Sequence, residues 1–398
     1  MKKTKKLISF LFSTKIIWRK PQKKQILIFD STDSDIFLEF FASEHSQFLD
    51  TRGESLNIGI LLNTILTGRL NWKSYIDQYI SWTKPKWIIT FIDNNLAFYQ
   101  LKREFPDIQM IVLQNGWRGE VADIFGKFKQ GLNKEAYFVD QMYLFGKVWC
   151  QKYSEFFGGR VESIGSIKNN RISINKNIKD RTITFLSQYR PTPQDKNNPM
   201  IVENGQSIYW EAFYAAEKRT VSYILNYCQK NHLKLRICAY SQCDENREYL
   251  YYKSILGDTD WEFHSRTGSY SSYSYIDSSE FIAFIDSTLG YEALARGKKT
   301  IAFSTRGDEV HNKDRNFGWP ADLTDTGPFW TNRDSEKEYE RILNFITSVN
   351  DDEWENIRRK YVSQLIDYDP ENKQLIACFQ NLGIPLKSEI IDVDHKTI

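Results

Sequence analysis

The sequence predicts an α/β protein built from two successive domains, each with a parallel sheet covered by helices. Short apolar stretches of strand length alternate with segments of helical periodicity along most of the 398 residues. A polar stretch over 171–181 separates two such series and is the expected linker. The length also suffices for two hydrophobic cores. This plan favours a ligand site in a cleft between the domains, beyond the carboxyl ends of the strands.

The first domain is expected to span 25–170. Its predicted strands are the short apolar stretches 25–30, 86–93, 109–114, 143–146 and 161–165. A helix is expected over 57–68, with Gly68 as its end.

The second domain is expected to span 182–350, followed by C-terminal helices and a tail over 351–398. Its predicted strands are 182–187, 233–238, 261–264, 281–285 and 299–303. A long helix is expected over 208–230, and further helices follow from Ser335 onward.

The composition describes a globular protein, with 41% hydrophobic and 26% charged residues. The formal charge of +2 gives no sign of a nucleic-acid partner, and we predict none. The five cysteines are scattered, without metal-ligand or redox spacing. This distribution favours a reduced, cytoplasmic compartment.

Residues 1–24 form a basic leader with nine Lys and Arg and no acid. The apolar stretch in it is interrupted by Lys15, which argues against a signal peptide, and it is far too short to span a bilayer. Two interpretations stay open. The leader is either a solvated basic segment or a peripheral anchor on the anionic inner face of the cytoplasmic membrane.

The turn 286–292 carries the clearest functional signal. A predicted strand ends at Asp286, and Ser287 and Thr288 begin a helix, where free N–H groups and the helix dipole favour phosphate. Glu292 lies one turn further, on the face of Thr288, from which its carboxylate can accept from ribose or sugar hydroxyls. Ordinary helix capping by Ser287 and Thr288 is the alternative.

The stretch from Ser287 to Lys298 resembles the donor-binding motif in the second domain of many GT-B glycosyltransferases. It looks most like the version in capsule and O-antigen enzymes, including bacterial Kdo transferases of capsule assembly. The resemblance implies a GT-B architecture, in which two Rossmann-like domains face a cleft and bind acceptor and donor respectively. It also implies that Ser287 and Thr288 face the nucleotide phosphates and that Glu292 faces the ribose.

A second resemblance lies in the first domain. The stretch 113–119, followed by 123–125, is similar to a signature of bacterial surface carbohydrate or O-antigen biosynthesis proteins. The stretches 144–146, 164–170 and 185–190 are similar to that family as well. Together these segments span roughly residues 110 to 305 and imply a place in surface polysaccharide assembly.

Three further residues are candidates for binding. Asn115 and Arg118 lie in a turn after a strand, where the guanidinium can clamp an acceptor phosphate or carboxylate. Arg190 follows the first strand of the second domain and is placed to meet donor phosphates. The alternative for Asn115 and Arg118 is a structural turn with a solvated arginine. The alternative for Arg190 is an interdomain ion pair.

An inverting transferase needs a general base near the acceptor hydroxyl, and a first-domain carboxylate is the usual provider. Asp30, Asp93 and Asp123 all lie at or after predicted strand ends. We favour Asp93 and Asp123 as catalytic candidates, although for each of them alone a helix cap or turn former is the simpler interpretation.

We predict neither a metal nor a cofactor. Asp-x-Asp, the metal-binding dyad of the other main glycosyltransferase fold, occurs at 33–35, 367–369 and 392–394, which shows how common the pattern is. No His/Cys cluster has ligand spacing. The helix dipole and Arg or Lys side chains would stabilise the leaving phosphate.

The expected function is transfer of a sugar from a nucleotide-activated donor to a lipid-linked or oligosaccharide acceptor of a surface polysaccharide. Three alternatives stay open. They are a CDP-alditol phosphotransferase, a nucleotide-sugar epimerase on the same fold, and a non-catalytic polysaccharide-assembly protein.

Overall fold

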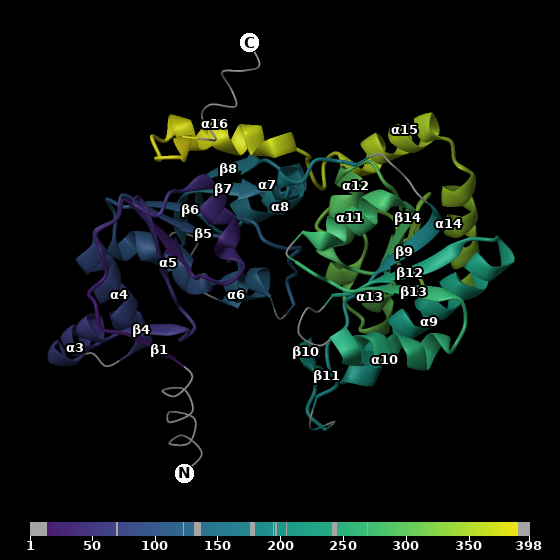
Figure 1. Ribbon diagram of the computed structural model, residues 1–398, viewed down its shortest axis with the longest axis horizontal. Coiled ribbons are helices and arrows are strands. Elements are labelled where there is room, and N and C mark those ends of the chain that lie inside the picture. The colour runs from purple at the N-terminus through teal and green to yellow at the C-terminus, as the bar shows by residue number, and fades with distance from the viewer. Residues whose placement is uncertain are drawn as a thin grey trace.

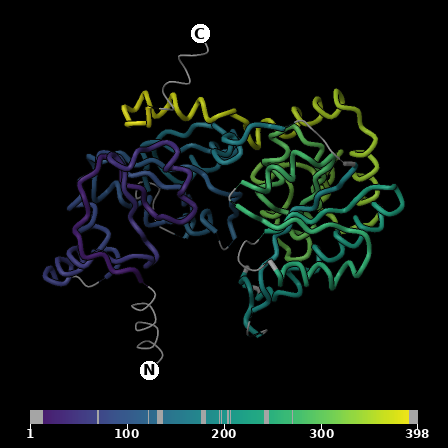
Figure 2. The backbone as a smooth tube through the Cα atoms, in the orientation of Figure 1, coloured from purple at the N-terminus to yellow at the C-terminus, as the bar shows by residue number. Residues whose placement is uncertain are grey.

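The computed structural model describes residues 14–388 except 69–70, 122, 131–136, 176–179, 194, 196, 204, 241–244 and 269. Two six-stranded sheets, parallel throughout, form two α/β domains that lie side by side (Figures 1 and 2). This arrangement confirms the predicted pair of Rossmann-like domains with C-terminal helices.

The first sheet has the order β3-β2-β5-β6-β7-β8. Its strands are β2 (Ile26–Phe29), β3 (Ser46–Leu49), β5 (Trp87–Thr90), β6 (Gln109–Leu113), β7 (Phe138–Leu144) and β8 (Gly158–Ser163). The helical segments of this domain are η1 (Ser34–Ile36), α2 (Phe37–Phe40), α3 (Ile58–Leu66), α4 (Trp72–Thr83), α5 (Leu96–Glu104), α6 (Ile124–Gln130), α7 (Lys147–Ser154) and α8 (Ile167–Arg171). Helices on both faces bury the inner strands, so those strands are continuous apolar stretches in the sequence.

The second sheet has the order β13-β12-β9-β14-β15-β16. Its strands are β9 (Asp180–Leu186), β12 (Lys234–Cys238), β13 (Trp261–His264), β14 (Ser279–Phe284), β15 (Lys299–Phe303) and β16 (Trp330–Thr331). The helical segments are α9 (Trp210–Lys230), α10 (Glu245–Leu256), α11 (Ser271–Ser278), α12 (Thr288–Ala295), α13 (Arg306–Glu309), η3 (Lys313–Arg315) and α14 (Glu336–Ser348). A separate antiparallel hairpin pairs β10 (Ile201–Glu203) with β11 (Gln206–Ile208).

The C-terminal helices connect the two domains. Helix α15 (Asp351–Val362) lies beside the second domain, and after η4 (Pro370–Asn372) helix α16 (Lys373–Asn381) lies over the first, as the yellow ribbon in Figure 1 shows. Phe379 of α16 packs against Phe41 and Tyr143, with ring centroids 5.5 and 6.0 Å apart. The tail therefore buries its apolar face on the first sheet although it follows the second domain in sequence.

Parts of the predicted leader and linker belong to regular structure. Residues 1–13 lie outside the described residues, but Lys15–Ile17 forms β1, which pairs in parallel with β4 (Ser55–Asn57). The second half of the leader therefore packs on the first domain. In the predicted linker 171–181, α8 ends at Arg171 and β9 begins at Asp180, while 176–179 is not described.

No helix in the described ranges is both long enough and apolar enough to cross a bilayer.

Candidate functional site

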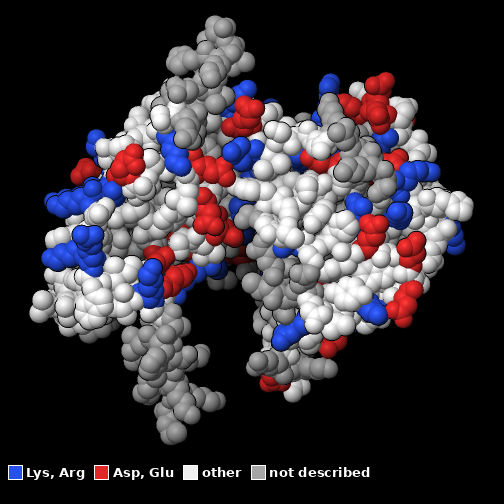
Figure 3. All heavy atoms as spheres, in the orientation of Figure 1, with Lys and Arg blue, Asp and Glu red and all other residues white. Residues whose placement is uncertain are grey.

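A cleft of about 640 Å³ lies between the two domains, at the carboxyl ends of their strands. Figure 3 shows the hollow that separates the two halves of the molecule. Loops after β5 and β6 supply the first-domain wall, and loops after β9, β14 and β15 supply much of the opposite wall. The charged or hydroxyl-bearing residues that line it include Arg118, Asp123, Arg190, Asp286, Thr288, Arg306, Asp314 and Arg315. This is the position that parallel α/β sheets favour for a ligand.

The predicted turn after β14 is present as expected. Ser287 is the N-cap residue of α12, but its side chain makes no capping hydrogen bond. Thr288 lines the cleft, and its Oγ1 accepts from the backbone N–H of Trp117 at 3.0 Å. The hydroxyl of Thr288 therefore joins the two domains at the floor of the cleft, and the α12 N-terminus points toward the first domain.

Glu292 lies one turn below this point and is buried. Its carboxylate accepts from Ser166 Oγ at 2.5 Å and from Tyr273 Oη at 3.0 Å. Burial raises the pKa of Glu292, and the two hydrogen bonds oppose that rise. Glu292 is not among the described residues that line the cleft, so its contact with a ribose stays a prediction.

Asp93 and Arg118 form an ion pair beside the cleft. The Asp93 carboxylate, fully buried after β5, accepts from Arg118 Nε at 2.9 Å, Tyr153 Oη at 2.7 Å and the Asn115 N–H at 3.2 Å. Burial alone would lower the pKa of Arg118, but the charge and hydrogen bonds of Asp93, together with smaller contributions from Tyr153 and Asp123, outweigh it and raise the pKa. In this conformation Asp93 holds Arg118 in place, and Arg118 rather than Asp93 lines the cleft.

Asp123 is the predicted base that reaches the cleft. Its carboxylate accepts from the N–H groups of Gly119 at 3.0 Å and Ile124 at 2.8 Å, at the start of α6. None of the ion pairs found between described residues involves Asp123. The helix-start role expected for this residue is therefore present, and the carboxylate also borders the open cleft.

The second domain places a network of buried charges at the same floor. Asp286 pairs with Arg306 and, at 3.1 Å, with Arg315. Burial alone would raise the pKa of Asp286, but the charges and hydrogen bonds of the two arginines together outweigh it and hold the pKa below its ordinary value. Arg306 also contacts Glu217 at 3.3 Å. Burial raises the pKa of Glu217 to about 7, although the charge of Arg306 opposes the shift.

Arg190 borders the cleft from the loop after β9 and is exposed. Its backbone carbonyl accepts from Trp210 Nε1 at 2.8 Å, and its side chain takes part in none of the ion pairs found between described residues. The interdomain ion pair that we considered for it is therefore not seen in the described structure.

Sequence reasoning missed part of the site. Arg306 lies three residues after the end of β15 and Arg315 twelve, and their one local signal is the position of a basic residue after a strand. The sequence indicates Trp117 only as part of the stretch 113–119. In the structure its ring stacks on Tyr291 of α12, with centroids 3.4 Å apart and planes at 6°. The hairpin β10–β11 supplies an apolar wall through residues 200–202.

The described residues contain no group of three or more His, Cys, Asp or Glu that could hold a metal ion. Cys150, Cys228, Cys238 and Cys378 are free thiols, and Cys243 lies outside the described residues. The Asp-x-Asp match at 392–394 lies outside them as well. The absence of a cofactor stays a prediction.

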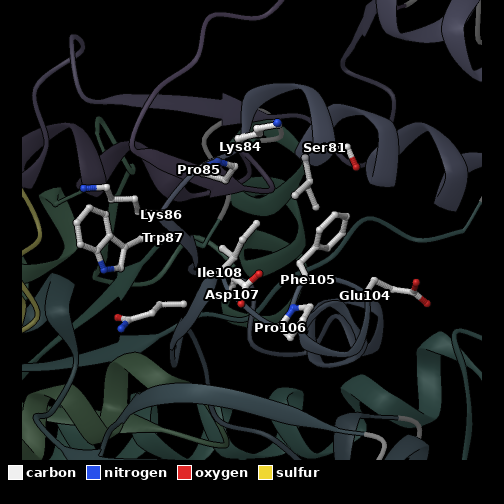
Figure 4. Close-up of a pocket in the computed structure, with 12 residues that line it drawn as sticks. Ser81, Lys84, Pro85, Lys86, Trp87, Glu104, Phe105, Pro106, Asp107 and Ile108 are labelled. Carbon is white, nitrogen blue, oxygen red and sulfur yellow. The ribbon is translucent and has the colours of Figure 1, made fainter.

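A second hollow of about 660 Å³ lies at the amino ends of β5 and β6, the opposite edge of the first sheet. Figure 4 shows the side chains around it, among them Lys84, Lys86, Trp87, Phe105 and Asp107. The labelled charged groups come from the ends of strands and helices and form no shared ionic network there. We therefore take the interdomain cleft as the candidate site.

Comparison with known proteins identifies the family. A family model described as "putative O-antigen biosynthesis protein" matches residues 111–382, more than half of the chain, and the chain belongs to this family. No curated protein matches.

Solved structures with a similar fold include two in complex with UDP or UDP-GlcNAc. An MnaA–UDP co-structure from S. aureus is 11% identical, with a TM-score of 0.53 and 92% of this chain and 98% of that chain covered. A UDP-GlcNAc 2-epimerase from Methanocaldococcus jannaschii, in complex with UDP-GlcNAc and UDP, is 9% identical, with a TM-score of 0.53 and coverage of 90% and 99%. At these identities the likeness establishes the fold, and it confirms the predicted GT-B-like architecture.

Proposed function

We propose that this protein is a glycosyltransferase that moves a sugar from a nucleotide-activated donor onto an acceptor of a surface polysaccharide. One observation carries the proposal. In the cleft, three arginines and a helix N-terminus on the second domain face an Asp123 carboxylate on the first that takes part in no ion pair among the described residues. Membership in an O-antigen biosynthesis family supports the pathway.

The second-domain wall suits the phosphates of the donor. Arg190 is exposed, while Arg315 and Arg306 are held against Asp286 at the start of α12. Charges fixed in advance stabilise a leaving nucleotide without reorganisation during the reaction. We place the donor phosphates here, with Ser287 and Thr288 at the helix start, and assign Glu292 to the ribose in a conformation that opens the Ser166 contact.

The first-domain wall suits the acceptor. In the proposed step the acceptor hydroxyl gives its proton to Asp123 while its oxygen attacks the anomeric carbon, and the nucleotide leaves toward the arginines. Arg118 and Asn115 would orient an acceptor phosphate or carboxylate. Asp93 is retained as a positioning residue, because its carboxylate already holds Arg118. No metal or cofactor is needed in this scheme.

The acceptor is proposed to be lipid-linked or an oligosaccharide. A lipid-linked acceptor would place the protein in the cytoplasm at the inner face of the cytoplasmic membrane, with the basic residues 1–24 toward the lipid. No nucleic-acid partner enters the proposal.

A nucleotide-sugar epimerase is the second candidate, because the similar solved structures named above are in complex with UDP or UDP-GlcNAc and one is an epimerase. Epimerisation at carbon removes a proton and returns one, so it needs acid–base groups on two faces of the sugar. Among the described lining residues, Asp286 is paired with arginines and Asp314 accepts from two first-domain N–H groups. Asp123 also accepts from two N–H groups, but it lies on the first-domain wall, across the cleft from the arginines, and this position favours transfer.

A thermal-shift panel with UDP, GDP, CMP and CDP tests the proposal. A nucleotide at about 100 times its Kd should stabilise the protein by roughly 2.7 kcal/mol. UDP or GDP would indicate a hexose donor, CMP an ulosonic acid and CDP the phosphotransferase alternative. No shift with any of the four would contradict a nucleotide-dependent transferase.

Turnover of the matching sugar nucleotide distinguishes the enzyme classes. We expect Asp123→Asn to lower transfer by about 10²–10⁴-fold, because the general base is lost. Asn keeps one acceptor oxygen for the backbone N–H groups of Gly119 and Ile124, so the melting temperature should change little. NMR of the sugar nucleotide incubated with the protein but without acceptor detects any epimer that forms. Formation of the epimer would show that the protein is an epimerase rather than a transferase.

A further inference from the structure

Helix α3 presents an apolar stripe to solvent at the end of the first domain. Leu62, Ile65 and Leu66 follow the helical spacing i, i+3, i+4 and are 55%, 42% and 84% exposed. The opposite face of α3 is buried through Ile60 and Thr64. A helix normally turns its apolar stripe inward, but among the described residues nothing covers the outward stripe of α3.

Basic and aromatic side chains border this helix. Lys20 approaches the start of α3, because a Cβ added at Gly59 would lie 3.2 Å from Lys20 Cγ. The amide of Asn57, the N-cap residue of α3, donates to the Arg19 carbonyl at 2.7 Å. The ammonium group of Lys20 lies 4.3 Å from the ring centroid of Trp82. Residues 17–24 therefore run along α3 and α4 (Ile58–Leu66 and Trp72–Thr83) and form one surface with them, at the lower left of Figure 1.

The composition of this surface matches a bilayer interface. Trp18 is 78% exposed, and Lys15, Arg19, Lys20 and Lys23 are all exposed beside it. Helix α3 itself contains no charged residue. Glu54, just before β4, is the exposed acid nearest in sequence to α3. Apolar side chains flanked by cations and Trp are the pattern of segments that lie in the interface of an anionic membrane.

We propose that the α3 surface, made of Trp18, Leu62, Ile65, Leu66 and the basic residues 15–23, docks the folded first domain on an anionic lipid bilayer. The occupant is lipid rather than protein because the apolar part is a narrow stripe and its border is cationic. Docking here orients the first domain, to which the proposed function assigns the acceptor. Membrane binding, which the proposed function assigns to the leader 1–24, would then also involve the folded first domain.

Flotation of the full chain with lipid vesicles tests the proposal. The variant Leu62→Asp with Leu66→Asp is compared with the matched control Leu38→Asp with Leu250→Asp, whose leucines are 45% and 53% exposed on other helices. On vesicles of phosphatidylglycerol and phosphatidylcholine we expect the α3 variant to partition at least about tenfold more weakly than the parent. The control should float like the parent. Binding of the parent should fall with added salt and on pure phosphatidylcholine.

Equal flotation of the α3 variant and its control would overturn the proposal. So would a parent dimer that the α3 variant converts to a monomer in size-exclusion chromatography, since α3 would then cover a second copy. If the double variant does not fold, Leu66→Ser against Leu250→Ser gives the same comparison with a smaller perturbation. Flotation uses no nucleotide. A negative flotation result would therefore contradict the membrane docking alone, and a negative thermal-shift panel would contradict the proposed function alone.

Discussion

The interdomain cleft and the cavity at the amino ends of β5 and β6 have nearly the same volume, about 640 and about 660 Å³. They differ in how their charges are held. At the cleft floor the buried Asp93 is paired with Arg118 and the buried Arg306 with Asp286, and both partners are only partly exposed, whereas Lys84 and Lys86 at the cavity are exposed. Charges kept away from water interact strongly and shift pKa values. The two hollows therefore do not differ in volume. They differ in whether their charged side chains are paired and shielded from solvent.

Among the substitutions that test this difference between the cleft and the cavity, a change of Arg306 should lower the stability most. Arg306→Met leaves Glu217 buried without its cation and removes one of two arginines from Asp286. Breaking a buried pair on one side costs about 3–5 kcal/mol of the free energy of unfolding. Urea denaturation measures the loss. Lys86→Met at the cavity is the control and should change stability by less than about 0.5 kcal/mol. An equal loss in both variants would show that the charges at the cleft are held no more firmly than those at the cavity.

The second effect is a pH dependence that arises from Glu217 at the cleft. Its pKa is raised from 4.5 to about 7 in the folded state, so between these values the folded protein binds more protons than the unfolded chain. Stability from this group is therefore full below about pH 4.5 and falls as pH rises to about 7, by roughly 3 kcal/mol at most.

Glu217→Gln should remove this part of the pH profile. Urea denaturation at pH 5 and pH 7 compares the parent with the variant, and the parent should lose more stability over that interval. Glu104→Gln at the cavity is the matched control and should keep the parental slope. A Glu217→Gln profile parallel to the parent would show that Glu217 is charged throughout.

A smaller effect is expected on nucleotide binding. Arg190 is exposed and takes part in no ion pair among the described residues, so Arg190→Ala should leave the melting temperature unchanged and weaken the nucleotide that binds best by about tenfold. Lys84→Ala at the cavity should bind like the parent. Calorimetric titration gives both dissociation constants, and weaker binding by the Lys84 variant alone would move the site to the cavity.

The smallest effect concerns the contact between the two cleft walls. Thr288→Val removes the acceptor for the Trp117 N–H, and a neutral hydrogen bond of this kind contributes about 1 kcal/mol. Thr288→Ser keeps the hydroxyl and should retain the parental melting temperature. A valine variant as stable as the serine variant would show that this hydrogen bond contributes nothing to holding the domains together.

The sequence sufficed for the inner strands of both sheets and for one edge strand of each, β8 and β13, but not for the edge strands β3 and β16. Strands such as β2 and β5 are buried on both faces and therefore appear as continuous apolar stretches. Edge strand β3 begins with Ser46 and Gln47, and β16 has two residues, so neither carries that signal. Strand β1 was hidden because its basic surroundings resemble a leader.

The candidate site was predicted in part for a similar reason. Arg118, Asp123, Arg190 and Thr288 follow strand ends, and the parallel fold brings them to one cleft. Asp93 follows a strand too, but only the tertiary structure shows that its carboxylate holds Arg118. The buried contact of Glu292 with Ser166 joins residues 126 positions apart, which no local pattern reveals.

Hydrogen–deuterium exchange of the full chain, with and without the nucleotide that binds best, tests the central claim most directly. The account predicts slower exchange at the α12 N-terminus, in the loop 117–121 and in the hairpin β10–β11, with no change around Pro85 and Phe105. Protection around Pro85 and Phe105 with an unchanged α12 N-terminus would contradict it, because the nucleotide would then occupy the cavity rather than the cleft.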